Sequence, residues 1–455
     1  MIDLAAERIA EVVGGTLESG HTETRPRRAV VDSRLVEPGD LFVGLPGQAE
    51  DGGAFAAEAL AAGAWGVMVS PRWSGAVAAA PMPERPPSPH GGERAPRGAI
   101  ILVDDPLAAL AGLARAWRRE LACPVVGVTG STGKTSTKDI LAALLRPYRR
   151  THANRENLNT EIGLPLSILD AEPGTEALVL EMAMRGEAQI AELTRIAEPS
   201  VGVVVNVGPV HLELLGTVER VAAAKAELIR DLPAGAACVV PAGERLLAEH
   251  LRDDLDTITF GRDGDVTLSS FNGGRAEIDA RGERIELELP YTQPHNVLNT
   301  LAAVAAAVAI GVRPEGRVEV AFSSMRGQEV ELPSGVTVIN DCYNANPMSV
   351  RAALEHLAGS PAERRLAVLG VMAELGPEAE RFHEEVGERA AELGIDVLVT
   401  VGPAARGFAR RFGREAHAVD VPEEAGALLE KIAGPGDRVL VKGSRSAGLE
   451  RVLGT

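Results

Sequence analysis

Short apolar runs that alternate with amphipathic segments dominate the middle of the chain. Three runs predict buried strands, namely Pro124–Val128, Leu178–Leu180 and Val201–Val207. Between the first two, the spacing of apolar residues predicts a helix over Lys138–Leu145. Strands that alternate with helices in this way are typical of a parallel sheet covered by helices. A further stretch, Asp265–Pro290, alternates apolar and polar residues around Asn-Gly-Gly and predicts a hairpin added to that sheet.

The last third of the chain repeats this alternation. Its strand candidates are Val336–Ile339, Leu366–Leu369, Val397–Val401 and Arg438–Val441. Helical patterns separate them at Val350–Leu357, Glu378–Leu393 and Glu423–Ile432. We therefore predict a second, smaller α/β unit with a doubly wound, Rossmann-like sheet.

The chain divides into three expected domains. Its 455 residues correspond to about three domains of average size. We place them at residues 1–104, a small Gly-rich α/β unit, at 105–313, the central sheet, and at 314–455. Within the first domain, residues 71–98 are dense in Pro, Gly, Arg and Ala, which predicts a disordered insertion.

Composition limits where the protein acts and what it binds. The chain is 45% hydrophobic and 24% charged, as in a globular protein, and its longest apolar run, Leu301–Val312, is shorter than a membrane span. Three cysteines and no signal-peptide pattern predict a cytoplasmic protein, and the lack of a Cys–His cluster argues against a structural zinc site. The net charge of −18 argues against nucleic-acid or anionic-lipid partners. An anionic substrate must therefore be held by local basic residues, helix N-termini or metal.

A Gly-rich run between the first strand and its helix predicts a phosphate site. Its glycines allow backbone N–H groups to face phosphate oxygens, Lys134 adds a positive charge, and the Thr135 hydroxyl suits magnesium. Val128 stands where the longer P-loop pattern has glycine, which leaves a Gly-rich turn with a surface lysine as the alternative to an ATP or GTP site. The candidate nucleotide-binding residues here are Gly130, Ser131, Thr132, Gly133, Lys134, Thr135 and Ser136.

A lysine interrupts the apolar face of a predicted helix. Thr217 is a candidate N-cap for this helix. One apolar stripe follows it, made of Val218, Val221, Ala222, Leu228 and Ile229, and Lys225 lies on this stripe. An unpaired ammonium group is costly there. The side chain therefore either bends toward solvent, pairs with an anion or is chemically modified.

Two further residues could share a metal site with this lysine. Glu181 ends an apolar strand, and His211 follows the next strand, so both can reach the carboxyl edge of the sheet, although a solvated acid and a structural histidine are the alternatives. A protonated lysine about 4 Å from a magnesium ion would cost about 8 kcal/mol at an effective dielectric constant of about 20. That exceeds the roughly 4–7 kcal/mol that corresponds to the largest pKa shifts of buried groups. Lys225 at such a site would be neutral or converted by carbon dioxide to a carbamate.

Motifs spread over nearly the whole chain resemble those of the Mur ligases, ATP-dependent amide-forming enzymes of peptidoglycan precursor synthesis. Besides the phosphate loop they are Asn157–Pro165 (NLNTEIGLP), Asn206–Glu213 (NVGPVHLE), Ala224–Glu227 (AKAE), His295–Asn299 (HNVLN), Asp341–Pro347 (DCYNANP), Leu369–Gly376 (LGVMAELG) and Lys442–Arg445 (KGSR). In the first domain, Asp32–Arg34 (DSR), Gly39–Phe42 (GDLF) and Asp51–Gly52 resemble the uridine-diphosphate domain of the family. The resemblance implies a substrate domain, a central P-loop ATPase-like domain and a C-terminal Rossmann-like domain.

The resemblance also implies roles for individual residues. Lys134 and Thr135 would bind the ATP phosphates and magnesium, with Lys134, Lys225 and His211 as the catalytic residues. Glu181, His211 and a carbamylated Lys225 would support two magnesium ions together with Thr135. The nucleotide would further contact Asn296, Arg326 and Asp341. The substrate would contact Ser33, Arg34, Asn157 and Thr160.

The implied reaction joins D-alanyl-D-alanine to the terminal carboxylate of UDP-N-acetylmuramoyl-tripeptide through an acyl phosphate, in a monomeric enzyme. His211 is a candidate base for the attacking amine only if it is free of metal. One alternative is a sibling ligase that adds a diamino acid to a dipeptide precursor or glutamate to a folate. Another is a P-loop protein that senses nucleotide without ligation, which would not require Lys225, Glu181 and His211 together.

Overall fold

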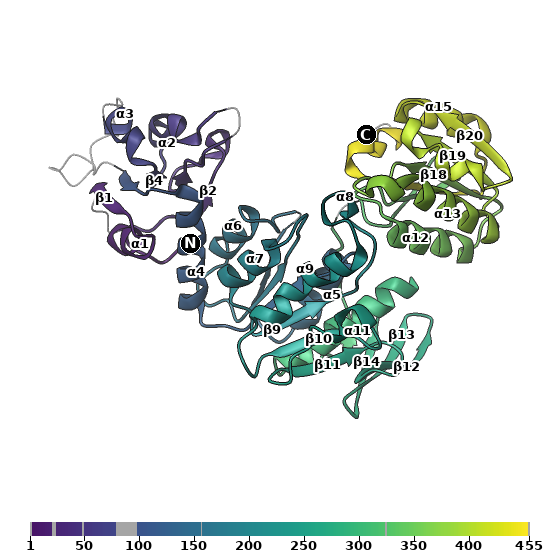
Figure 1. Ribbon diagram of the computed structural model, residues 1–455, viewed down its shortest axis with the longest axis horizontal. Coiled ribbons are helices and arrows are strands. Elements are labelled where there is room, and N and C mark those ends of the chain that lie inside the picture. Colours follow the sequence, from purple (N-terminus) through teal and green to yellow (C-terminus); the bar gives the residue numbers. More distant parts are fainter. Residues whose placement is uncertain are drawn as a thin grey trace.

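The strands of the molecule form three separate sheets, and each sheet is the centre of one lobe. The computed structural model describes residues 2–20, 24–47, 50–78, 98–155, 157–323 and 325–453. The N-terminal lobe holds strands β1 to β5, the central lobe β6 to β15 and the C-terminal lobe β16 to β21. The N- and C-terminal lobes lie at opposite ends, with the central lobe between them (Figure 1). The expected α/β architecture with three units is confirmed.

The N-terminal lobe has a five-stranded sheet in the order β1-β5-β4-β3-β2. All its pairs are parallel except β1 with β5. The strands are β1 (Thr16–Ser19), β2 (Ala29–Val30), β3 (Leu41–Val43), β4 (Gly66–Val69) and β5 (Ala99–Leu102), with helices α1 (Ala6–Val12) and α2 (Ala56–Ala61).

The predicted disordered insertion is wrong for residues 71–78. These form the 3-10 helix η3 (Pro71–Trp73) and the helix α3 (Ser74–Ala78). Val77 is buried in the core of the lobe, and Trp73 Nε1 donates a hydrogen bond to Asp51 Oδ1 at 2.9 Å. The two apolar residues anchor a segment whose average composition resembles a linker. Residues 79–97 of the predicted insertion lie outside the described residues. Its last residue, Gly98, leads into β5.

The central lobe contains a ten-stranded sheet in the order β15-β14-β13-β12-β11-β10-β9-β6-β8-β7. Its parallel part is β6 (Val125–Thr129), β7 (Thr151–Ala153), β8 (Ala177–Glu181), β9 (Val201–Val204), β10 (Ala237–Pro241), β11 (Asp256–Phe260) and the start of β12 (Val266–Asn272). Helices α5 (Lys134–Leu145) and α11 (Pro294–Ala309) pack in one apolar core on this sheet. Helices α4 (Pro106–Leu121), α6 (Gly163–Leu169), α7 (Gln189–Ala197) and α9 (Val218–Asp231) contribute to another. Cover by two separate cores explains why β6 is buried along its whole length.

The predicted hairpin is confirmed as an antiparallel extension of the central sheet. Strand β12 turns into β13 (Arg275–Ala280) through Gly273 and Gly274, whose positive φ angles of 56° and 87° suit glycine, and β14 (Glu283–Glu288) follows. Strand β15 (Gly316–Arg317) pairs with β14. The central sheet therefore continues past residue 313, where we expected the domain to end.

The C-terminal lobe has a six-stranded sheet in the order β16-β17-β21-β18-β19-β20, parallel except for the edge pair β16–β17. Its strands are β16 (Gln328–Glu331), β17 (Thr337–Asn340), β18 (Arg365–Gly370), β19 (Val397–Val401), β20 (Glu415–Val419) and β21 (Arg438–Lys442). Its helices include α12 (Pro347–Gly359), α13 (Ala379–Glu392), α14 (Gly407–Arg410) and α15 (Pro422–Ile432). The predicted smaller doubly wound unit is confirmed, and the four strand candidates coincide with β17, β18, β19 and β21.

The carboxyl edge of the central sheet is where the predicted phosphate and metal residues come together. The parallel strands β6, β8 and β9 end side by side, with Val128 paired to Glu181 and Thr129 to Val204. Loops that follow such carboxyl ends are where ligands of parallel sheets usually bind. The short helix α8 (Leu212–Leu215) continues from this edge toward the C-terminal lobe (Figure 1).

In the described part of the chain, no helix combines the length and apolarity needed to span a bilayer.

Candidate active site

The Gly-rich loop after β6 is held in shape by the loop after β9. Asn206 accepts a hydrogen bond from the backbone N–H of Thr132 through Oδ1 at 2.9 Å and donates one to the Thr132 hydroxyl at 2.9 Å. The backbone N–H of Gly208 donates to the hydroxyl of Ser131 at 2.9 Å. Gly133, with φ of 74°, is the N-cap residue just before α5, so the loop leads into a helix N-terminus as predicted. Such a turn can present N–H groups to phosphate oxygens.

Helix α11 closes one side of this loop. A Cβ atom on Gly133 would lie only 2.6 Å from Asn299 Oδ1, so glycine is needed here for space as well as for its positive φ. Asn299 Nδ2 in turn donates to Asn296 Oδ1 at 3.4 Å. The predicted nucleotide residue Asn296 is therefore connected to the phosphate loop through Asn299.

Glu181 is a buried carboxylate beside the phosphate loop. The hydroxyl of Thr135 donates to its Oε2 at 2.7 Å, and Asn159 Nδ2 donates to its Oε1 at 2.9 Å. Asn154 fixes the backbone, because its Oδ1 accepts from Glu181 N at 2.8 Å while its Nδ2 donates to Glu181 O at 3.1 Å. The solvated strand-end acid that we held as an alternative is wrong, since Glu181 is only 2% exposed.

Lys225 lies on the buried face of α9, as the apolar stripe predicts. It is 2% exposed, and Thr217 caps the helix by accepting from Arg220 N at 3.3 Å. Burial lowers the pKa of Lys225 well below its ordinary value, and the nearby charge of Lys134 lowers it further. Because the side chain is buried, the alternative of a lysine that bends into solvent is wrong. Among the described residues, Lys225 also has no hydrogen-bond or ion-pair partner. The lowered pKa favours the uncharged form of the amine, which is the form that can act as a nucleophile.

His211 joins the central lobe to the C-terminal lobe. Its Nδ1 contacts Glu374 Oε2, and Glu374 belongs to the loop after β18. Burial lowers the pKa of His211, the Glu374 carboxylate opposes this, and the charges of Lys225 and Lys134 contribute to the lowering. His211 thus lies within electrostatic range of both site lysines.

Residues of the C-terminal lobe also reach the site. Burial lowers the pKa of Lys134, the charge of Glu181 opposes this and that of Arg326 adds to it, so both charges lie near the phosphate loop. The Arg326 guanidinium lies 4.3 Å from the centre of the Tyr343 ring, and its Nε is buried without a hydrogen bond. The carboxylate of Asp341, in contrast, already has a partner within the lobe, because Lys442 Nζ donates to its Oδ2 at 2.6 Å.

The four predicted substrate residues lie apart from this buried group. Ser33 and Arg34 belong to the 3-10 helix η1 (Ser33–Leu35) of the N-terminal lobe, where Arg34 is exposed and pairs with Asp32 at 2.6 Å. This guanidinium lowers the pKa of Asp32 to about 2. Asn157 and Thr160 are exposed on the loop before α6, whereas Asn159 between them faces inward to Glu181.

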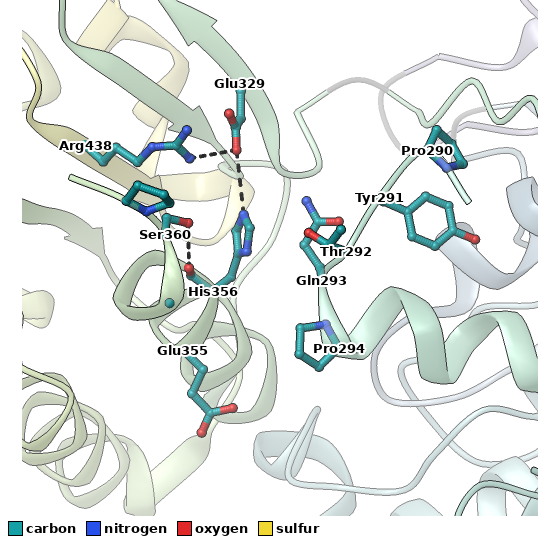
Figure 2. A pocket seen from close by; sticks show the side chains of 12 residues that line it. Pro290, Tyr291, Thr292, Gln293, Pro294, Glu329, Glu355, His356, Ser360 and Arg438 are labelled. Carbon is teal, nitrogen blue, oxygen red and sulfur yellow. Dashed lines mark hydrogen bonds and ion pairs between the residues drawn. The ribbon is translucent and has the colours of Figure 1, made fainter. Parts of the chain in front are cut away.

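A cavity of about 700 Å³ opens between the central and C-terminal lobes (Figure 2). The segment before α11, which includes Tyr291 and Gln293, forms one wall. On the facing wall Glu329 lies between Arg438 and His356, at 3.0 Å and 3.8 Å. None of the predicted site residues lines the cavity, although Gln293 lies three residues before Asn296.

Comparison with known proteins identifies the family. Residues 128–307 match the Mur ligase middle domain, and residues 325–445 match the Mur ligase, glutamate ligase domain. A Bacillus subtilis protein named UDP-N-acetylmuramoyl-tripeptide–D-alanyl-D-alanine ligase is 34% identical over 469 residues, which cover 100% of this chain and 98% of the relative. The chain belongs to the Mur ligase family.

Solved structures of Mur ligases share the three-lobed arrangement. MurF from Acinetobacter baumannii is 27% identical, with a TM-score of 0.84 over 99% of this chain and 98% of that one. The MurF ligase from Thermotoga maritima, solved in complex with ADP, is 34% identical, with a TM-score of 0.76 over 94% and 96%. Both similarities extend over all three lobes, including the N-terminal lobe that the two family matches leave out.

Three residues of this Mur ligase site were given no role from sequence. Asn154 and Asn159 orient Glu181, and Glu374 contacts His211. The available signal for Asn154 was its position directly after β7, the strand beside β8. Glu374 carried no local signal, because it lies 163 residues from His211 in the chain.

The protein alone supplies few carboxylate ligands for a metal. Within the described ranges, no group of three or more His, Cys, Asp and Glu side chains is arranged to hold an ion. Magnesium in nucleotide sites is usually bound by one or two carboxylates together with phosphate oxygens and water. Glu181 with the Thr135 hydroxyl fits that donor set, and the unpartnered amine of Lys225 could add a carbamate.

Proposed function

We propose that this protein catalyses the ATP-dependent ligation of D-alanyl-D-alanine to the terminal carboxylate of UDP-N-acetylmuramoyl-tripeptide, in peptidoglycan precursor synthesis. The observation that carries the proposal is the hydrogen bond of 2.7 Å from Thr135, in the phosphate loop, to the buried Glu181. It puts a metal-type oxygen pair directly beside a phosphate cradle. The family and the names of its full-length relatives support the choice of substrates.

ATP would bind with its phosphates in the loop formed by residues 130–136, at the N-terminus of α5. Lys134 would neutralise phosphate charge there. Asn296, Arg326 and Asp341 would contact the rest of the nucleotide, and the unpaired Nε of Arg326 leaves it a donor for this purpose. The cavity shown in Figure 2 lies beside the segment before α11, where Gln293 on its wall precedes Asn296 by three residues.

Magnesium would be held by Thr135, Glu181, His211 and a carbamylated Lys225, which suits two ions. When bound, it would neutralise charge on the transferring phosphoryl group. The protein's own contribution is to hold these groups in place before the reaction. Asn159 and Asn154 keep Glu181 fixed, and burial on the apolar face of α9 lowers the pKa of Lys225, which favours the uncharged amine that reacts with carbon dioxide.

The reaction needs an activated carboxylate, because a carboxylate is a poor electrophile. Phosphoryl transfer from ATP would give an acyl phosphate, with Lys134 stabilising the developing charge. Attack by the amine of D-alanyl-D-alanine would form a tetrahedral intermediate that expels phosphate. Asn157 and Thr160 would hold the substrate near the reacting carboxylate, while Ser33 and Arg34 of the N-terminal lobe would contact its uridine-linked part. Closure of the lobes before the chemical steps would shield the acyl phosphate from water.

Phosphate release tests the proposal directly. We expect release with ATP, magnesium, UDP-N-acetylmuramoyl-tripeptide and D-alanyl-D-alanine all present, and product of the summed mass without water. Omission of the dipeptide should stop turnover, and Thr135→Val should abolish it whereas Thr135→Ser should retain it. Release without the dipeptide, or none with all components, would refute the ligase function. A panel of UDP-tripeptides in the same assay identifies the third residue of the natural substrate.

A further inference from the structure

The contact of His211 with Glu374 is one of the points where the C-terminal lobe touches the nucleotide edge of the central sheet. We propose that Glu374 is a positioning residue that fixes the imidazole ring of His211 at this edge. The inference rests on the proposed function only where it assigns His211 to the metal site. The contact itself, its backbone geometry and its origin in two lobes are independent of that assignment.

The chemistry of the pair selects one ring nitrogen. An ionised carboxylate can only accept a hydrogen bond, so His211 Nδ1 must carry the hydrogen that points to Glu374 Oε2. In the neutral ring, Nε2 then keeps its lone pair. Histidines that bind metals commonly donate their other ring N–H to a carboxylate in this manner, which sets both the tautomer and the ring orientation. Glu374 would thus make Nε2 the nitrogen that His211 offers to a metal ion.

Both residues of the pair have unusual backbone angles. His211 has φ of 54° and Glu374 has φ of 62°, in the left-handed region that non-glycine residues rarely adopt. Such conformations persist where the surrounding structure imposes them, and they cluster at functional sites. Two of them in direct contact, on loops from different lobes, point to a junction with a required geometry.

The backbone around the pair is also fitted together. The N–H of Glu213 donates to the carbonyl oxygen of Glu374 at 3.2 Å. At Gly376, whose φ is 61°, a Cβ atom would lie 3.3 Å from the Cα of Glu213, so the two loops approach closely. Leu375 and Leu212 are both buried in the same apolar core. The carboxylate of Glu374 is therefore delivered to His211 by a packed loop.

Electrostatic attraction alone does not account for the arrangement. Arg185 Nε lies 3.7 Å from the other oxygen of Glu374, but the arginine side chain is 75% exposed. Exposed ion pairs of this kind contribute little. The role that remains for Glu374 is geometric, and it couples the orientation of His211 to the placement of the C-terminal lobe.

The experiment measures binding of Mn²⁺ in the presence of ADP, by electron paramagnetic resonance, together with ligation kinetics. In Glu374→Ala we expect the Kd for Mn²⁺ to rise about 10- to 100-fold and kcat to fall, as for other partners of metal-binding histidines, with KM for the UDP-tripeptide unchanged. Glu374→Gln, whose amide oxygen can still accept from Nδ1, should lose less. Glu378→Ala, two residues after the close-packed Gly376 and paired only with exposed Arg381 among the described residues, is the matched control and should bind Mn²⁺ normally.

A double-mutant cycle decides whether Glu374 acts through His211. The double variant Glu374→Ala/His211→Ala should bind Mn²⁺ no more weakly than His211→Ala alone, because Glu374 would act only through the imidazole ring that His211→Ala removes. Additive effects, or normal Mn²⁺ affinity in both Glu374 variants, would overturn the proposal. If the wild-type protein binds Mn²⁺ and ADP but does not ligate, the proposed function fails while the Mn²⁺ measurements still test the role of Glu374. If Glu374→Ala does not fold, Glu374→Gln and a double-mutant cycle of Glu374→Gln with His211→Ala provide the same test.

Discussion

Lys225 and Lys138 are each 2% exposed beside the central sheet, yet within the described structure Lys138 has partners for its ammonium group and Lys225 has none. Lys138 Nζ donates to the carbonyl oxygen of Asn154 at 2.7 Å and lies 3.0 Å from Asp139 Oδ1. The two lysines therefore pose opposite problems. One is a satisfied structural cation, and the other is a buried amine that the fold tolerates at a cost.

Replacement of each lysine by methionine should change stability in opposite directions. In buffer free of carbon dioxide and metal, Lys225→Met should raise the free energy of unfolding by about 1–3 kcal/mol at pH 7, because it removes an unpartnered polar group from an apolar face. Lys138→Met should lower it by about 3 kcal/mol, since it removes the cation paired with the mostly buried carboxylate of Asp139, which then keeps, among the described residues, only its hydrogen bonds from Ser323. Urea unfolding of the two variants and the wild type gives both values.

The gain from Lys225→Met should also depend on pH. The folded protein holds the pKa of Lys225 well below the value in the unfolded chain, so between these two values the unfolded chain binds more protons. The stability of the wild type therefore rises with pH in this window, up to the ordinary lysine pKa of 10.5, and the variant lacks this rise. We expect the difference between them to shrink from pH 7 to pH 10. A difference independent of pH would mean that Lys225 is charged in the folded state.

Carbamylation of Lys225 predicts a specific pattern of activity. Lys225→Arg should lose at least about 100-fold in kcat although it keeps the positive charge, because arginine does not form the carbamate that would support the metal. Lys225→Ala should be equally impaired and should recover partly when formate or acetate is added. The rate of ADP release measures the activity of the wild type and of both Lys225 variants. Lys431→Arg, on the exposed face of α15, serves as the control. A fully active arginine variant excludes the carbamate.

Asn159 and Asn157 should separate structural support from substrate contact. Asn159→Ala removes the donor to Glu181 Oε1 and should cost about 1–3 kcal/mol of stability together with much of the activity. Asn157 is exposed, so Asn157→Ala should leave the melting temperature unchanged and raise KM for the UDP-tripeptide. Thermal unfolding and steady-state kinetics on both variants provide the comparison. An unchanged KM in Asn157→Ala would remove that residue from the substrate site.

Local sequence patterns predicted the parts of the site that depend on one element. The spacing along α9 placed Lys225 on a buried face, and the position of Glu181 at the end of an apolar strand placed it at the carboxyl edge. Both predictions follow from the periodicity of helices and strands, which a single segment reveals. The strand order β9-β6-β8, which brings Thr135 to Glu181, needs the connections between segments as well.

Contacts between distant segments could not be predicted in this way. Glu374 meets His211 through the packing of two lobes, and no periodicity in either loop encodes that contact. The error at residues 71–78 has a similar origin, because the burial of Val77 depends on a core formed by other segments. Average composition outweighed Trp73 and Val77, the two residues that anchor the segment.

The N-terminal lobe offers a test that separates substrate binding from folding. The Arg34 side chain is 86% exposed and pairs with Asp32, and an ion pair so exposed contributes little to stability. Arg34→Ala should therefore leave the melting temperature unchanged while it raises KM for the UDP-tripeptide about 10-fold, the loss of roughly one charge-assisted hydrogen bond. The KM for D-alanyl-D-alanine should stay the same. The matched control is Arg8→Ala, which removes another exposed arginine–carboxylate pair, with Glu11 on α1, and should leave both KM values unchanged. If Arg34→Ala behaves like Arg8→Ala, the uridine-linked part of the substrate binds elsewhere on the lobe.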